Sequence, residues 1–125
     1  MYKRQLVNAI GNGGNIKLTG EVIDLNGDNL EIAKDVALDL NGKKITGNIY
    51  SDDIAKGIIY VTSGAKLTII DSSGSMGTIE NTGSSGTAEY RGTVISSNGG
   101  TIIIESGNFQ ARGQIFDLRL SLIHI

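Results

Sequence analysis

Hydrophobic and polar side chains alternate in short stretches along this chain, and the spacing is clearest between Leu30 and Ile45. Leu30 and Ile32 are separated by one residue, as are Leu38 and Leu40. A period of two is typical of a β-strand, in which successive side chains point to opposite faces. The stretch therefore predicts three short strands separated by tight turns.

The same spacing recurs on both sides of this stretch. The strand spacing is preserved while the interval between units grows, which indicates a stacked repeat of the β-solenoid type. The residues that lengthen the interval, Thr46–Gly57 and Ile70–Gly92, are expected to form loops. Phe116 and Leu118 begin a further unit. The matching positions are Ile16, Leu18 and Ile23 upstream, and Ile59, Val61, Leu67, Ile69, Val94, Ser96, Ile102, Ile104 and Phe109 downstream.

The repeat alignment also predicts which residues of successive units lie above one another. Equivalent residues in parallel strands stack about 4.8 Å apart. A slip by one residue would turn the apolar side chains of a strand outward. The predicted inward columns are Leu38, Leu67, Ile102 and Leu40, Ile69, Ile104, and the outward columns are Glu31, Tyr60, Ile95 and Asp39, Thr68, Ile103.

A short amphipathic helix is expected before the first unit. Leu6, Val7, Ala9 and Ile10 fit one face of a helix, and the run Gly11–Gly14 is a stop signal. A stack of coils exposes apolar surface and unpaired strand edges at its ends, so such a helix is expected to cap the first coil. We expect residues 6–14 to form this cap and residues 15–119 to form about four coils with no C-terminal cap.

Four segments carry a resemblance to a known family: GGNIKLTGEV, NLEIAKDVALDLNGKKITG, IIYVTSGAKLTIIDSSGSMGTIEN and TIIIESGNF. Over residues 6–119 the chain resembles the right-handed parallel β-helix of pectin-lyase-like bacterial surface and secreted proteins. The resemblance implies an all-β, single-stranded parallel β-helix. That family contains polysaccharide lyases, glycoside hydrolases and phage tailspikes as well as non-catalytic stalk and adhesin modules, so the fold does not select the function.

Both termini resemble translated sequencing-adapter sequence. Residues 120–125 read LSLIHI, one frame of a transposase-end adapter, and residues 1–5 read MYKRQ, a frame of its reverse complement. Segments of this kind are set aside from fold reasoning, so residues 6–119 are interpreted as natural sequence. The alternative is an authentic start followed, at the other end, by a hydrophobic last strand.

Composition narrows the classes of function. The chain has 18 glycines and no proline, which suits a fold with many turns. A net charge of −2 without a cluster of Lys and Arg argues against nucleic-acid binding. The lack of cysteine excludes disulfides and thiolate metal sites. We expect no metal, no cofactor and no membrane insertion in residues 6–119.

Carboxylates on the two long loops are the candidate catalytic residues. Asp52 and Asp53 lie on the first loop, and Glu80, Glu89 and Arg91 lie on the second. Enzymes of the family that the chain resembles use clustered Asp or Glu as calcium ligands or as an acid–base pair, and the lyases add an Arg or Lys base. The two loops leave one corner of successive coils, so these groups could converge. We favour the alternative, in which they are solvated loop residues.

Outward-facing residues are the candidate ligand contacts. Tyr60, Glu31 and Thr68 would lie on flat sheet faces that could hold a glycan, although a plain solvent-exposed face is the favoured reading. Weaker motifs are set aside. Asp71–Gly74 lacks the alternating acids of a calcium loop, Gly11–Gly14 is followed by a strand and so cannot be a dinucleotide loop, and no histidine other than the terminal His124 is available for a catalytic triad.

The sequence therefore predicts a non-catalytic β-helical stalk or adhesin-type module of an extracellular or cell-surface bacterial protein. Its expected partners are a polysaccharide or host-cell glycan and the adjacent coils of the parent chain. The alternative is a fragment of a carbohydrate-active enzyme, a lyase, glycoside hydrolase or tailspike, whose catalytic coils lie beyond residue 119.

Overall fold

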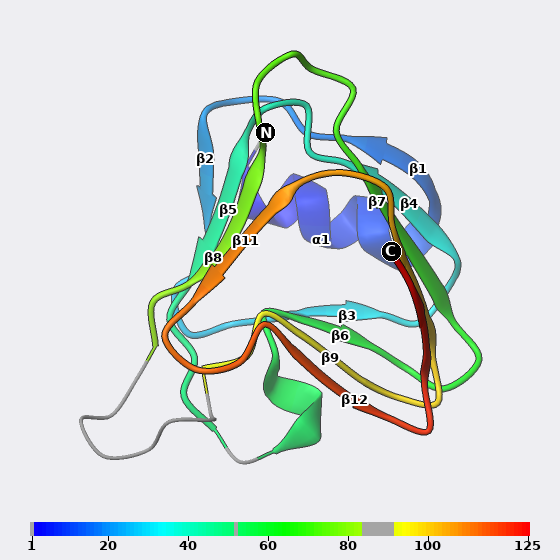
Figure 1. Cartoon of the computed structure of the whole chain (residues 1–125). Helices are drawn as coiled ribbons and strands as arrows, with labels where there is room; N and C mark the ends of the chain where they lie inside the picture. The colour runs from blue at the N-terminus through cyan, green and yellow to red at the C-terminus, as the bar shows by residue number, and fades with distance from the viewer. Residues whose placement is uncertain (1, 52, 84–91) are drawn as a thin grey trace.

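The computed structural model describes residues 2–51, 53–83 and 92–125. Within these residues the chain forms one α-helix, one short 3-10 helix and thirteen strands (Figure 1). The elements are α1 (Lys3–Asn12), β1 (Gly14–Lys17), β2 (Val22–Asp24), β3 (Leu30–Ile32), β4 (Val36–Asp39), β5 (Lys44–Gly47), η1 (Ile54–Lys56), β6 (Ile59–Val61), β7 (Lys66–Ile70), β8 (Thr78–Asn81), β9 (Ile95–Asn98), β10 (Thr101–Ile104), β11 (Asn108–Ala111), β12 (Phe116–Arg119) and β13 (Leu122–His124).

The strands form three parallel sheets that run along the stack of coils. Sheet A has the order β1-β4-β7-β10-β13, sheet B the order β2-β5-β8-β11 and sheet C the order β3-β6-β9-β12. Each coil therefore contributes one strand to each sheet, as the three-strand unit predicted. In Figure 1, which looks along the stack, the three sheets form the sides of a triangle. The fold is a parallel β-solenoid-like stack, and β13 extends it into residues 122–124.

Apolar side chains from all three sheets fill the inside of the triangle. A strand residue on this face is buried whereas its neighbours along the strand point outward, for example in β3, where Leu30 and Ile32 are buried and Glu31 is exposed. The residues stack from coil to coil because the strands pair in register, so one continuous core runs along the molecule. Its members with no exposed surface include Leu18, Leu25, Ile32, Leu38, Leu40, Ile45, Ile59, Val61, Leu67, Ile69, Ile79, Ile95 and Ile102.

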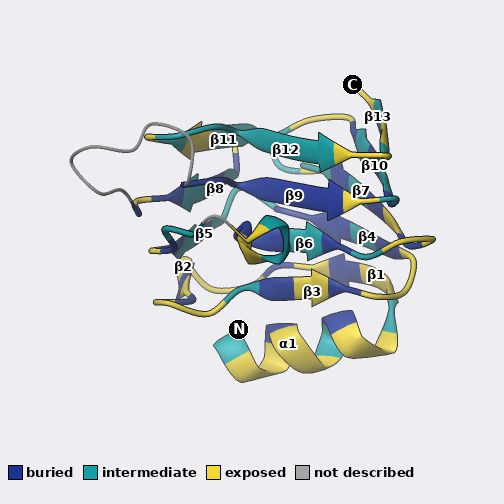
Figure 2. Ribbon diagram, turned by 90° about the horizontal axis from the view of Figure 1, so that it is seen from below, coloured by how far each residue is buried: buried dark blue, intermediate teal, exposed yellow. Residues whose placement is uncertain are grey.

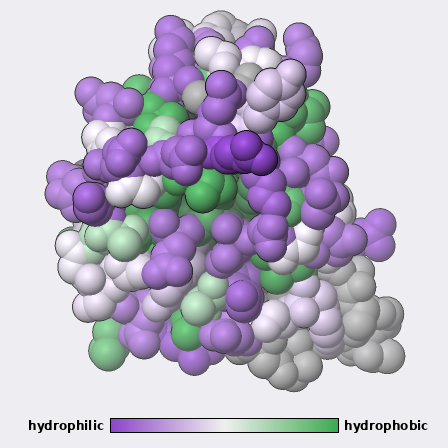
Figure 3. All heavy atoms as spheres, turned by 180° about the vertical axis from the view of Figure 1, so that it is seen from behind, coloured by the Kyte–Doolittle hydropathy of each residue, from purple (hydrophilic) through white to green (hydrophobic). Residues whose placement is uncertain are grey.

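The predicted helix covers the first coil, where it packs against β1 and β3 (Figures 1 and 2). It begins at Lys3, earlier than expected, and ends where Gly13 takes a positive φ of 78°. Leu6 and Ile10 are buried, but Val7 is 44% exposed, so its assignment to the apolar face was wrong. Figure 3 views this end of the molecule: a band of hydrophilic side chains crosses it, with hydrophobic atoms visible beside the band.

The predicted register is wrong between the second and third coils. Leu38 pairs with Ile69 instead of Leu67, although Leu67 with Ile102 and Ile69 with Ile104 are correct. Leu40 is buried beyond the end of β4 and takes no place in the column assigned to it. Because the shift is an even number of residues, every side chain keeps its predicted face.

The cause of this shift is the corner between sheets C and A. In the third coil residues 62–65 form a turn that is closed by the N–H of Ala65 donating to the carbonyl of Thr62 at 3.1 Å, with Gly64 at a φ of 84°. Ile32 pairs with Val61 and Leu38 with Ile69, so this corner is two residues longer in the third coil than in the second. As a result Thr68 lies beside Ala37, and Asp39 lies beside Ile70, on the outer face of sheet A.

A slip of one residue also separates the prediction from the structure in β9. Ile95 pairs with Ile59 and Ser97 with Val61, so these two residues follow the inward register, whereas Ser96 takes the outward position beside Tyr60. Val94 and Ser96 had been assigned inward and Ile95 outward. Two serines are buried here because hydrogen bonds satisfy them: Ser97 Oγ donates to the carbonyl of Val61 at 2.8 Å, and Ser96 Oγ accepts from the N–H of Gly57 at 3.0 Å.

The inward register predicts very different outcomes for charges at two adjacent positions. Leu67 has no exposed surface, whereas Thr68 faces outward and is half-buried. We expect Leu67→Asp to lower the free energy of unfolding by roughly 3–5 kcal/mol, because the carboxylate would be buried without a partner. Thr68→Asp should cost less than about 1 kcal/mol. Urea denaturation of both variants measures the difference, and equal losses would contradict the register.

Candidate functional site

The longest connections leave the corner between sheets B and C. Residues 48–58 join β5 to β6, and residues 82–94 join β8 to β9, so both insertions depart from the same corner of successive coils. The extra length expected over residues 70–92 is divided between two corners. Residues 71–77 form a turn between sheets A and B, β8 follows as the expected third strand of the coil, and the second insertion begins at residue 82.

A buried side chain, Asn81, ties the two insertions together. Its Nδ2 donates to the carbonyls of Ile49 at 3.0 Å and Thr93 at 2.9 Å. Its Oδ1 accepts from the N–H groups of Ile49 at 3.1 Å and Gly83 at 2.8 Å. Asn81 is 1% exposed. The Thr93 carbonyl also accepts from the N–H of Ile58 at 3.1 Å, but among the described residues the Ile49 groups and the Gly83 N–H have no partner besides Asn81.

The corner at Asn81 is also too crowded for side chains. A Cβ on Gly83 would lie 2.3 Å from the carbonyl oxygen of Ile49, and a Cβ on Gly92 would lie 2.2 Å from the carbonyl oxygen of Gly83. Both glycines are therefore required by close backbone approach. Gly83 and Gly92, the described residues on either side of 84–91, therefore lie in contact with each other.

We predict that Asn81 contributes more stability than its size suggests. Asn81→Leu keeps the volume but leaves the N–H and carbonyl of Ile49 and the N–H of Gly83 without the partner that Asn81 supplies, and it should lower the free energy of unfolding by roughly 3–5 kcal/mol. Asn81→Asp keeps the acceptor oxygen, loses the two donated bonds and introduces a buried charge. Its loss of unfolding free energy should therefore differ from that of the leucine variant. Chemical denaturation of both variants tests this, and a leucine variant as stable as the wild type would contradict it.

The first insertion folds back over the outer face of sheet C as η1. The N–H of Asp53 donates to Ser51 Oγ at 3.1 Å, and the Asp53 carboxylate accepts from the N–H of Ala55 at 2.9 Å. Asn29 Nδ2 donates to the carbonyl of Ala55 at 2.7 Å. The bond from the Gly57 N–H to Ser96 Oγ ties the end of η1 to β9, and η1 packs against β6 and β9.

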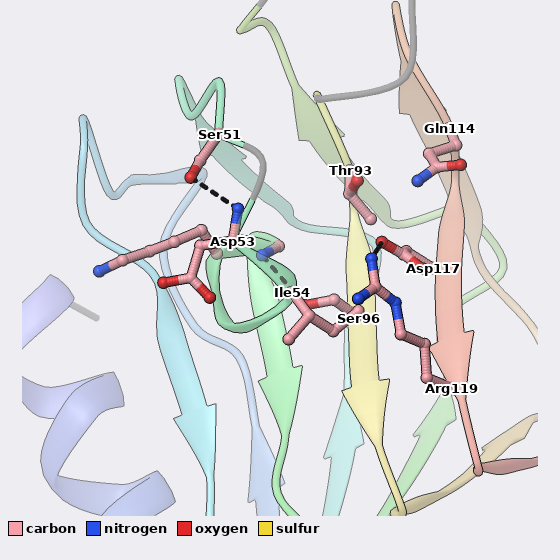
Figure 4. Close-up of a pocket in the computed structure, with 10 residues that line it drawn as sticks. Ser51, Asp53, Ile54, Thr93, Ser96, Gln114, Asp117 and Arg119 are labelled. Atoms are coloured by element: carbon pink, nitrogen blue, oxygen red, sulfur yellow. Dashed lines mark hydrogen bonds and ion pairs between the residues drawn. The ribbon is translucent and has the colours of Figure 1, made fainter.

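A groove of about 250 Å³ lies between η1 and the neighbouring strand β12. Figure 4 shows Ser51, Asp53 and Ile54 on one side and Gln114, Asp117 and Arg119 on the other, with Thr93 and Ser96 from the β9 segment between them. Lys56 and Gly57 complete the lining. Arg119 Nη2 lies 3.5 Å from the Asp117 carboxylate. The walls therefore offer hydroxyl, amide, carboxylate and cationic groups with one aliphatic side chain.

The predicted catalytic candidates fall in different places. Asp53 lines the groove, whereas Asp52, Glu89 and Arg91 lie outside the described residues. Glu80 lies on β8 and lines a separate hollow on sheet B. Its carboxylate accepts from Thr46 Oγ1 at 3.1 Å and pairs with Lys44 Nζ at 3.2 Å. Within the described residues, Asp53 and Glu80 thus line different cavities.

The predicted ligand contacts are also divided. Glu31 and Tyr60 occupy one outward column of sheet C, as expected, while Thr68 lies on sheet A. Strand pairing extends that column through Ser96 to Asp117, which brings it into the groove. Asp117 was missed by sequence reasoning, but a signal existed: it stands between the inward pair Phe116 and Leu118, so it had to point outward.

At the corner between sheets A and B, two aspartates bind backbone N–H groups of neighbouring coils. Asp39 Oδ1 accepts from Asn41 at 2.9 Å and Ser72 at 3.0 Å. Asp71, in the segment dismissed as a calcium loop, accepts from Gly42 at 3.0 Å and from the N–H and Oγ of Ser73 at 3.1 Å and 2.7 Å. It also accepts from the N–H of Gly77. The two carboxylates therefore join the second coil to the third.

These hydrogen bonds determine the ionisation of both aspartates. Burial raises the pKa of Asp71, but bonds from the Ser73 hydroxyl and from the N–H groups of Gly77, Ser73 and Gly42 outweigh it, and the pKa is lowered below its ordinary 3.8. Burial likewise raises the pKa of Asp39, and bonds from Ser72 and Asn41 lower it overall. A lowered pKa means that the folded state holds the ionised form more tightly than the unfolded state does.

We predict acid-sensitive stability that depends on Asp71. Because its folded pKa is lowered, its contribution is fully present above the unfolded pKa of 3.8 and is lost as the pH falls through the folded pKa. Asp71→Asn should be less stable at neutral pH and should show a flatter fall in melting temperature below about pH 5.

Ser106→Ala provides the matched control for this prediction. Ser106 Oγ accepts the N–H of Asp71 at 2.7 Å, so the variant removes a hydrogen bond at the same corner without removing a charge. Its melting temperature should fall with acid as steeply as that of the wild type. An Asp71→Asn profile parallel to the wild-type profile would contradict the proposed role of the carboxylate.

Among the described residues, no group of three or more His, Cys, Asp and Glu side chains is placed to hold a metal ion. In the same part of the chain, no helix has the length and apolar character needed to cross a membrane. No known family model matches the chain, and neither does any curated protein or solved structure.

Proposed function

We propose that this chain is a section of a right-handed parallel β-helix that acts as a non-catalytic scaffold, of the stalk or adhesin type, in a bacterial extracellular or cell-surface protein. The observation that carries the proposal is that carboxylates of this chain bind backbone N–H groups or a lysine within the stack. Asp39 and Asp71 bind backbone N–H groups across coils, and Glu80 pairs with Lys44. These acidic groups hold the stack together and are not free to work on a substrate.

The ionisation of the acidic groups supports the same proposal. Enzymes that cleave glycosidic bonds with two carboxyl groups need one of them protonated, with a raised pKa. In the described residues three carboxyl groups have displaced pKa values, and all three are lowered. For Asp28 the main cause is its hydrogen bond with Lys3. This direction favours ion pairing and backbone anchoring over proton transfer.

Stacked parallel strands suit a spacer between other parts of a protein. Each coil adds about 4.8 Å along the axis. The backbone hydrogen bonds between coils resist bending, and the corners can carry insertions without disturbing the core. A rod of this kind holds its insertions at fixed positions, and here both long insertions leave one corner. Further coils of the parent chain are its natural neighbours.

Contact with a glycan is a second role, and the groove beside η1 favours it. Sugar hydroxyl groups both donate and accept hydrogen bonds, so they match a wall that presents Asp53 and Asp117 as acceptors and Lys56, Gln114 and Arg119 as donors. The Asp117–Arg119 pair is partly exposed and could be shared with a ligand. The groove has room for a unit of a polysaccharide or host-cell glycan.

The alternative is that the chain belongs to a carbohydrate-active enzyme, a lyase, glycoside hydrolase or tailspike, whose catalytic coils lie beyond residue 119. In that case the described coils would supply substrate contacts or support, and the groove would form one end of a longer cleft. The two roles differ in one measurable respect, because only the second requires bond cleavage.

We expect the chain, purified together with further coils of its parent protein, to release no product from pectin, alginate or host-cell glycans, while it binds a glycan through the groove. Binding, followed by titration calorimetry or NMR, should weaken roughly tenfold in Arg119→Gln, because a charged donor is lost. Thr68→Ala on sheet A should bind as the wild type does.

Each part of this experiment can fail separately. Cleavage of any of these polymers would overturn the scaffold proposal, and loss of that cleavage in Asp53→Asn would locate the reaction in the groove. Binding that is unaffected by Arg119→Gln but weakened by Thr68→Ala would move the glycan contact to the outer face of sheet A.

A further inference from the structure

Four asparagines in this chain are followed by glycine: Asn12–Gly13, Asn26–Gly27, Asn41–Gly42 and Asn98–Gly99. Glycine leaves the next backbone nitrogen unhindered, so that nitrogen can attack the side-chain amide carbon of the asparagine. The attack requires the nitrogen to give up its proton, and an N–H that is held in a hydrogen bond must first be released. The partners of the four glycine N–H groups therefore rank the four sites.

Three of the glycine N–H groups are bound. The acceptors for Gly13 lie in the last turn of the helix. The acceptors for Gly42 and Gly99 lie in the following coil or in the turn after it. The bonds are Gly13 N–H to the carbonyls of Ala9 and Ile10 at 3.1 Å each, Gly42 N–H to Asp71 Oδ1 at 3.0 Å, and Gly99 N–H to the carbonyl of Arg119 at 2.8 Å and to Ser121 Oγ at 3.0 Å.

The pair Asn26–Gly27 differs from the other three. Both residues are exposed, and no residue in the described part of the chain accepts a hydrogen bond from the Gly27 N–H or contacts the Asn26 side-chain amide by one. Asn41 lies in the same left-handed backbone region, with φ 49° against 54° for Asn26, but its Nδ2 donates to the carbonyl of Leu18 at 3.1 Å. The two sites share a backbone conformation and differ in protection.

We propose that Asn26 is a site of spontaneous deamidation in the folded protein. The Gly27 nitrogen forms a bond to Asn26 Cγ, the Cγ–Nδ2 bond breaks, and the amide leaves as ammonia with the proton from Gly27. Water then opens the resulting succinimide ring at either carbonyl. The product is an aspartyl or an isoaspartyl residue at position 26, and no oxidant or enzyme takes part. The conversion does not depend on the proposed scaffold role.

The position of Asn26 gives the conversion a structural consequence. Its carbonyl accepts the N–H of Asn48 at 2.7 Å, which joins the first coil to the second. An isoaspartyl residue lengthens the main chain by one methylene at this corner and displaces that carbonyl. The new carboxylate also lies in sequence between Asp24 and Asp28, and Asp28 forms an ion pair with Lys3 of the capping helix. Conversion should therefore loosen the first coil and its cap.

The test is to age the folded chain in mildly alkaline buffer and to measure each site by peptide mapping with an assay for isoaspartate. Asn26 should convert at least about tenfold faster than Asn41, since releasing Gly42 from a charged acceptor slows the attack by roughly that factor. In urea the four sites should convert at similar rates, which would show that the fold causes the selectivity. The aged protein should melt at a lower temperature than fresh protein.

Gly27→Ala is the matched control. A Cβ at Gly27 would meet no atom within 4 Å, and the residue is outside the positive-φ region, so alanine fits the fold. The added methyl group hinders the attacking nitrogen, and conversion at Asn26 should slow by about tenfold or more while Asn41 is unchanged. The proposal is overturned if Asn12, Asn41 or Asn98 converts as fast as Asn26 in the folded chain, or if Asn26 converts only in urea.

Discussion

Parallel pairing between successive coils is the constraint on which the rest of this structure depends. It fixes the height and register of every strand, so residues in excess of a coil are displaced to the three corners. Backbone groups at a corner leave the ladder and need other partners. Each corner supplies them with a buried or half-buried polar side chain: Asp39 and Asp71 between sheets A and B, Asn81 between B and C, and Ser97 between C and A.

The sequence predicted the strands well because burial inside the stack imposes a period of two on side chains. Pairings within a sheet, such as Leu30 with Ile59 and Leu67 with Ile102, followed from that period. Corner lengths did not, because a turn such as residues 62–65 can absorb residues without changing the polarity pattern. The slip at β9 has the same origin: two adjacent serines are both buried there, so polarity no longer distinguishes the inner face from the outer one.

The candidate site was harder to predict than the fold, since it depends on contacts between residues far apart in sequence. Asp53 could be named because it lies on a long polar loop. Ser96 could not, because its burial results from η1 folding back over β9, and nothing in the local sequence indicates this. Asp117 and Arg119 enter the groove only because β12 stacks next to β9. These side chains come together only when the coils stack, so motifs taken one at a time along the sequence do not reveal the groove.

Charged side chains are used differently at the corners of the stack and on the outer face of sheet C. Carboxylates at the corner between sheets A and B are surrounded by N–H groups and held ionised, so they are committed to the fold. On the outer face of sheet C, by contrast, the Asp117 carboxylate pairs with the side chain of Arg119. There the first insertion departs from the repeat and folds over β6 and β9, and the groove lies between it and β12. A regular solenoid presents flat faces, and a binding site arises where an insertion breaks that regularity. If the chain contacts a ligand, the physical argument therefore favours the step between η1 and β12 over any uninterrupted face of the stack.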